Sequence, residues 1–211
     1  MRELPEIRIY FSFLLYYGES KILAGDNELG TYEGHEKWTK AYRKEWMKYE
    51  KRVLSSLTKV LGISFYKPVI DVACAPYFVP KSDPLIMNFR YEPDEFVDVL
   101  THELCHILLT DNNKTSIHDY VNKPKLDLAK EWKKLYSIDD FNALVHVPVH
   151  ALSKYIYLDV LKQPERLKRD MKTMESYANN EAYVEAWDYV NEHDYKKIIE
   201  DLKKMYEKVQ A

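Results

Sequence analysis

His102, Glu103 and His106 are the residues whose types and spacing are best suited to chemistry. The two histidines are four positions apart, so on a helix they project from one face, one turn apart, where two imidazoles can bind one metal ion. Glu103 is offset by one position and can act on a water molecule at that metal without being a ligand. This spacing predicts a hydrolytic metal site with His102 and His106 as ligands.

A buried helix is expected to carry these three residues. Pro93 suits a first helical position, and the two acidic residues after it suit a helix N-terminus. The run 96–109 is apolar on nearly every side, which is typical of a helix inside a protein core. Because burying histidine and glutamate without partners is costly, their presence there indicates a function. The alternative is a core helix whose histidines bind backbone carbonyl groups.

The pattern His-Glu-x-x-His at 102–106 resembles the active-site motif of the zincin metallopeptidases. The resemblance implies a Zn²⁺ ion held by His102 and His106, with Glu103 as the general base in the hydrolysis of peptide bonds. It also implies a peptide or protein substrate. It covers residues 84–110 and one ligand segment further along the chain.

A third protein ligand is expected, because catalytic zinc sites usually combine three protein ligands with one open position. His146 and His150, again four apart, lie in an apolar segment that gives no packing reason for two imidazoles. We expect His150 to be the third ligand, and His146 to be either that ligand or a group that stabilises the transition state. Two core histidines bonded to backbone carbonyls are the alternative.

Glu181 is the competing candidate for the third ligand. The stretch 180–185, Asn-Glu-Ala-Tyr-Val-Glu, resembles the glutamate helix of the gluzincins. That resemblance implies Glu181 as a ligand and Glu185 as support for a histidine. The plain alternative is an exposed glutamate on a helix rich in acids. His118, in a polar segment after the motif, is a further candidate.

The composition describes a packed globular protein with no sign of nucleic-acid binding. The 211 residues include 31 basic and 34 acidic side chains, for a net charge of −3, and no cluster of Lys and Arg stands out. Cys74 and Cys105 do not suggest a disulfide framework, so we expect a reducing, cytoplasmic setting. The apolar run 7–17 is too short and too interrupted for a membrane span or a signal peptide.

The predicted fold is a single α+β domain over residues 1–211, zincin-like by its resemblance. A small sheet is expected in the N-terminal half and helices in the C-terminal half. Strands are expected at 7–17, 63–73 and 83–91, and the prolines in and around the last two favour edge positions. In zincins the strand before the active-site helix lines the cleft, and residues 84–89 hold the matching place for binding a peptide by strand addition.

Helical periodicity is clear in the other segments. Ser137 is expected to cap the helix that carries His146 and His150, and Pro148 must either start or kink that helix. The helices expected from periodicity span residues 35–61 with Gly62 as the C-cap, a short segment after Pro124, 141–161, 165–190 and 194–209.

Two other functions are compatible with the sequence. Four protein ligands would close the coordination sphere, and the protein would then be a zincin-like metal-binding or peptide-binding module without catalysis. A metal hydrolase acting on another kind of bond is the third alternative.

Overall fold

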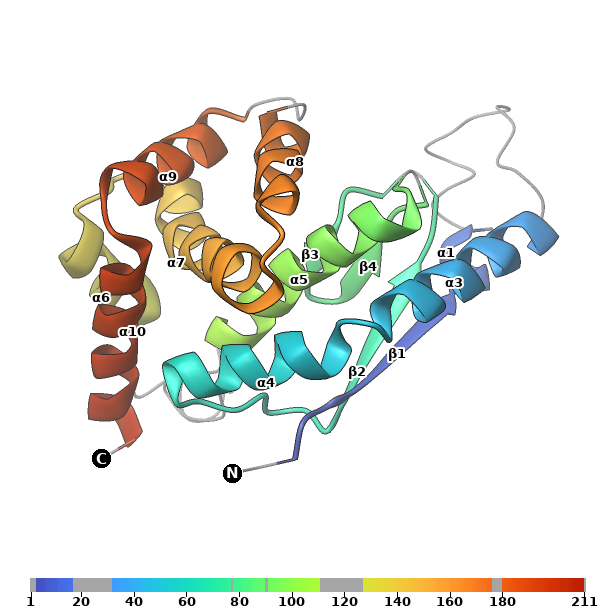
Figure 1. Ribbon diagram of the computed structural model, residues 1–211, viewed down its shortest axis with the longest axis horizontal. Helices are drawn as coiled ribbons and strands as arrows, with labels where there is room; N and C mark the ends of the chain where they lie inside the picture. The colour runs from blue at the N-terminus through green and yellow to red at the C-terminus, as the bar shows by residue number, and fades with distance from the viewer. Residues whose placement is uncertain are drawn as a thin grey trace.

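The N-terminal half of the chain forms a small sheet, as the computed structural model shows (Figure 1). The structure describes residues 3–16, 32–76, 78–89, 91–110, 127–175 and 180–210. The strands within these ranges are β1 (Glu6–Phe11), β2 (Val69–Cys74), β3 (Lys81–Ser82) and β4 (Leu85–Met87). Their order is β1-β2-β4-β3; β1, β2 and β4 run parallel, and β3 is antiparallel to β4.

β2 and β4 lie inside the sheet, so the prediction that they are edge strands is wrong. β2 is paired with β1 and β4, and β4 is paired with β2 and β3. The prolines fall outside the paired residues, since Pro68 precedes β2 and Pro84 lies in the turn between β3 and β4. A proline excludes an interior strand only where it occupies a paired position itself. Because β3 pairs with Leu85 and Ile86, the side of β4 opposite β2 is occupied by the chain itself over these two residues.

Helices form most of the remaining described chain, and the α+β class predicted from the sequence is confirmed. None of the helices in the described ranges is long and apolar enough to span a membrane. The helices are α1 (Phe13–Leu15), α3 (Tyr32–Trp46), α4 (Glu50–Leu61), α5 (Pro93–Thr110), α6 (Leu128–Tyr136), α7 (Phe141–Tyr155), the π-helix η2 (Ile156–Leu161), α8 (Pro164–Glu175), α9 (Glu181–Glu192) and α10 (Tyr195–Gln210).

Two of the predicted helices are divided. The segment 35–61 breaks at a turn over residues 47–49, between α3 and α4. The segment 165–190 contains α8 and α9, with residues 176–179 outside the described part of the chain. Gly62 ends α4 as predicted, with a φ of 71° and its N–H bonded to the carbonyl of Thr58.

Asp140, and not Ser137, caps the helix that carries His146 and His150. The Asp140 carboxylate accepts a hydrogen bond of 2.8 Å from the N–H of Ala143. Ser137 has a φ of 56° and ends α6 instead. Serine and aspartate are similarly good N-caps, so the sequence did not distinguish them. α7 begins before Pro148 and runs through it.

α5 is the buried helix that the sequence predicts, and α3, α4, α7 and α8 pack around it. Near its start, Phe96 stacks on Tyr42 of α3 with ring centroids 4.0 Å apart. Near its end, the carbonyl of Leu109 accepts a hydrogen bond of 2.6 Å from the hydroxyl of Tyr206 in α10. Figure 1 shows α3 and the strands beside one end of α5, and α6 and α10 toward the other.

Two arginines of α8 bind the acidic first turns of α5. Arg166 donates to the carboxylate of Asp98 at 2.6 Å and to the carbonyl of Asp94 at 3.0 Å. Arg169 donates to Asp98 at 2.8 Å. The side chains of Arg166 and Asp98 are only 3% and 2% exposed. Burial raises the pKa of Asp98 to about 6 against the opposing effect of the two arginines. It is therefore ionised at pH 7, and α5 depends on the arginines to balance this charge.

Removing Arg166 is expected to destabilise the fold. The Arg166→Met variant keeps a long apolar side chain but leaves Asp98 buried with Arg169 alone, and we expect a loss of about 3 kcal/mol in the free energy of unfolding. Urea denaturation followed by circular dichroism measures this. The exposed Lys204, which pairs with Glu200, is the control, and Lys204→Met should change stability little. Equal effects of the two changes would contradict the assignment.

Asp170, also on α8, is a buried acid of a different kind. Its side chain lies in the interior, and neither carboxylate oxygen has a hydrogen-bond partner among the described residues. Burial raises its pKa well above the ordinary value. The native state therefore keeps the Asp170 proton at pH values where the unfolded chain has released it. Because the native state then binds more protons, the stability should fall as the pH rises above the ordinary aspartate pKa.

The Asp170→Asn variant is expected to lack this part of the pH dependence. It should match the wild type at about pH 2.5, where Asp170 is protonated in both states of the wild type. Above the ordinary aspartate pKa, it should gain on the wild type by up to about 1.4 kcal/mol per pH unit, until the folded-state pKa is passed. Thermal unfolding of both proteins between about pH 2.5 and 8 measures the difference. Parallel pH profiles would show that Asp170 is ionised in the folded protein.

Candidate metal centre

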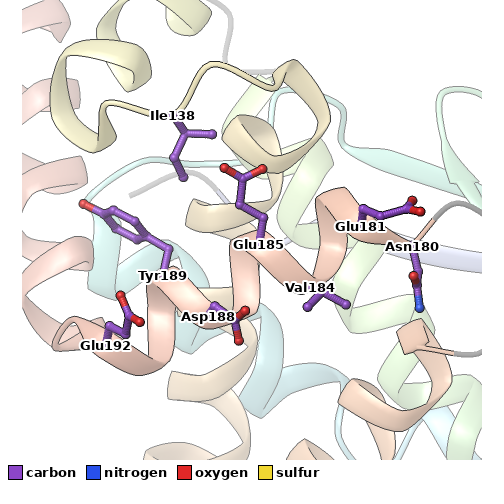
Figure 2. A pocket seen from close by; sticks show the side chains of 8 residues that line it. All are labelled: Ile138, Asn180, Glu181, Val184, Glu185, Asp188, Tyr189 and Glu192. Atoms are coloured by element: carbon purple, nitrogen blue, oxygen red, sulfur yellow. The ribbon is translucent and has the colours of Figure 1, made fainter.

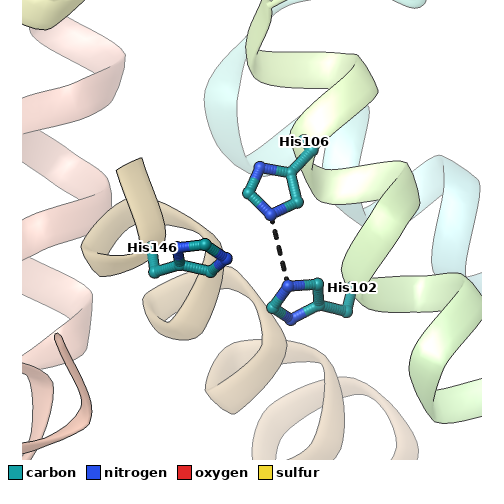
Figure 3. Close-up of side chains that lie close together, drawn as sticks. All are labelled: His102, His106 and His146. Atoms are coloured by element: carbon teal, nitrogen blue, oxygen red, sulfur yellow. Dashed lines mark hydrogen bonds between the residues drawn. The ribbon is translucent and has the colours of Figure 1, made fainter. Parts of the chain in front are cut away.

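His102 and His106 project from the same face of α5, as their spacing predicts. Their Nε2 atoms face each other at 3.2 Å, and their ring centroids are 5.0 Å apart (Figure 3). Two nitrogens bound to one tetrahedral zinc ion are about 3.3 Å apart. The two rings are therefore already separated by the distance that one shared zinc ion requires.

α7 brings His146 to the same point. One nitrogen from each of His102, His106 and His146 lies within 4.8 Å of the others, and Figure 3 shows the three rings converging from α5 and α7. The Nδ1–H of His146 donates a hydrogen bond of 2.6 Å to the carbonyl of Asn142. Because the proton is on Nδ1, the Nε2 lone pair of His146 is free to bind a metal.

The electrostatic environment keeps these histidines neutral. Burial, together with the neighbouring His146, lowers the pKa of His106 to about 3. Burial also lowers the pKa of His102 well below its ordinary value and lowers that of His146. A neutral imidazole is the form that binds zinc. Three neutral histidines with converging nitrogens form a donor set that fits a metal ion, and His102, His106 and His146 would hold it.

Glu103 is nearly buried beside this group, with 7% of its surface exposed. It has no hydrogen-bond partner among the described residues, and burial raises the pKa of its carboxyl group to about 8. A group whose pKa lies near neutral pH can both take and give a proton under physiological conditions.

His150, the expected third ligand, lies beside the metal group and is not one of its members. Its ring stacks on Trp187 of α9, with centroids 4.2 Å apart and an interplanar angle of 10°. It is fully buried, and neither ring nitrogen has a partner among the described residues. The geometry thus favours His146 as the third ligand. The turn of α7 that carries His146 is the one that approaches His106, and the ring centroids of these two histidines are 4.9 Å apart.

Glu181 and Glu185 lie on the outer face of α9, away from the histidines. Both are exposed, and neither belongs to the group of converging ligand atoms. They line a surface pocket with a volume of about 590 Å³ (Figure 2). The gluzincin arrangement is therefore not formed by these residues. His118, the remaining candidate, lies outside the described residues.

Sequence reasoning missed the aromatic residues that cover the site from α9. The ring of Tyr183 lies 4.3 Å from that of His146, and Trp187 stacks on His150. From the sequence, we assign a function only to the acids of the segment 180–185. Tyr183 and Trp187 are four positions apart and share one helical face, and this spacing could have identified them as neighbours of the histidines.

Comparisons with protein-family models, with curated proteins and with solved structures give no match.

We predict that His146→Ala abolishes stoichiometric zinc binding and that Glu181→Ala does not. The purified wild-type protein should hold about one zinc ion per chain after dialysis, because its three histidines complete a protein ligand set. Elemental analysis of the three proteins measures the content, and circular dichroism checks that each is folded. Zinc retained by His146→Ala and lost by Glu181→Ala would reverse the assignment.

Proposed function

We propose that the protein is a zinc-dependent peptidase. The observation that carries the proposal is the convergence of His102, His106 and His146 next to Glu103 on the same helix. Three histidine ligands leave one position of a tetrahedral zinc ion for water or substrate, as in catalytic zinc sites. The His-Glu-x-x-His pattern adds the resemblance to zincin peptidases.

Each residue of the proposed site has its own role in hydrolysis. Zinc, when bound, would polarise the scissile carbonyl group and lower the pKa of a coordinated water molecule. Glu103 takes a proton from the attacking water and gives it to the leaving amine. The neutral rings of His102, His106 and His146 would bind the zinc ion. His106 is the least buried of the three, so a substrate reaches the site from its side.

A closed metal-binding module without catalysis is the second candidate. One observation favours it: the ring of His150 lies 5.7 Å from that of His102 and 5.6 Å from that of His146. A fourth histidine ligand would leave no open position. Its exclusion from the group of converging nitrogens favours the peptidase.

We predict that Glu103→Gln keeps the fold and the zinc but lowers peptide hydrolysis by about 10²- to 10⁴-fold, because the amide cannot accept the proton. A broad peptide library analysed by mass spectrometry supplies the substrates, and the best one then gives rates. The matched control is Glu185→Gln, an exposed acid on α9, which should cleave like the wild type.

Two outcomes would reject this role. Loss of zinc from Glu103→Gln would make Glu103 a ligand or a structural residue. If the zinc-loaded wild type cleaves no member of the library, the closed binding module becomes the better description.

A further inference from the structure

We propose that His150 is a positioning residue of the metal site, which accepts a hydrogen bond from the Nδ1–H of His102 and so fixes the ring that offers Nε2 to the metal. The inference rests on the proposed zinc site. It gives His150 a role other than that of a ligand.

His102 needs an acceptor for its second nitrogen. A histidine that binds a metal through one nitrogen normally donates the other N–H to a fixed acceptor, which orients the ring and raises its basicity. His146 has such an acceptor in the carbonyl of Asn142, four positions earlier. The corresponding carbonyl for His102 belongs to Asp98, and it already accepts the hydroxyl of Tyr157 at 3.2 Å.

The structure leaves this need unmet within α5. The Nδ1 of His102 is buried and has no partner among the described residues. Figure 3 shows this nitrogen on the side of the ring that faces away from His106. An acceptor must therefore come from a neighbouring element.

His150 offers the acceptor from α7. Both of its nitrogens are buried and without partners in the described part of the chain, and its ring centroid is 5.7 Å from that of His102. A straight N–H···N hydrogen bond between two imidazoles places the centroids about 5.2 Å apart. The bond therefore requires the two rings to approach by about 0.5 Å and to turn until a nitrogen of His150 faces the Nδ1 of His102. One contact then satisfies an orphaned donor and an orphaned acceptor together.

The surroundings of His150 favour this role over the two others. Its nitrogens lie outside the group that converges on the metal position, which argues against a ligand. The side chain has no exposed surface, so a substrate does not reach it. Trp187 stacks on the face of the His150 ring and holds its plane while leaving the edge with the nitrogens free to bond.

The first test is zinc affinity, measured by competition with a chelator. His150→Phe keeps an aromatic ring without an acceptor, and it should weaken zinc binding by about 10- to 100-fold. His150→Asn and His150→Gln place an amide oxygen near one or the other nitrogen position, and the better of them should stay within about threefold of the wild type. Trp187→Phe, which changes the packing and keeps the acceptor, is the control and should also stay within that range.

Spectroscopy separates positioning from ligation. The cobalt(II)-substituted His150→Phe protein should keep the visible spectrum of the wild type, because its ligands are unchanged. In the zinc protein with ¹⁵N-labelled histidine, the hydrogen-bonded Nδ1–H of His102 should be visible in the wild type and absent in His150→Phe.

The inference is overturned if His150→Phe binds zinc as tightly as the wild type, if neither amide variant is better than phenylalanine, or if the cobalt spectrum of His150→Phe shows a lost ligand. If zinc affinity depends on residue 150 as expected but the protein cleaves no peptide, the proposed peptidase activity is refuted and the positioning role of His150 stands. A wild-type protein that binds no zinc would overturn both.

Discussion

The cost of burying imidazole and carboxyl groups in an apolar helix is the constraint on which this structure depends. α5 is buried along almost its whole length. Of its two histidines, His102 is buried and His106 is partly accessible. Polar groups in such a place must be paired or bind a ligand. A single metal ion would let His102, His106 and His146 use their lone pairs together.

The same constraint explains how much of the site could be predicted. His102, Glu103 and His106 were identifiable because residues that act together on one helix have a fixed spacing, which a sequence shows directly. The third histidine of the converging group comes from another helix, and its identity depends on how α7 crosses α5. His146 and His150 share one face of α7, so periodicity marks both, and only their distances to α5 separate them.

The fold was predictable where local patterns decide it and less so where tertiary contacts do. The buried helix at 93–110 and the left-handed Gly62 follow from composition and backbone preference. The break at 47–49 has no glycine or proline, so nothing local marked it. The interior position of β4 depends on pairing with β2, more than ten residues earlier in the chain. The bonds from Arg166 and Arg169 to Asp98 join positions about 70 residues apart, beyond any local pattern.

The hydrogen bond from Tyr206 to the carbonyl of Leu109 has a consequence for the order of events in folding. The two residues are 97 positions apart, so the carbonyl of Leu109, in the last turn of α5, gains this partner only when α10 has docked. Contacts between such distant positions form late, because the entropy of closing the intervening loop must first be overcome. His102 and His106 lie on the helix that this bond anchors. Any metal binding by these histidines would thereby be coupled to the docking of α10 as well as to that of α7.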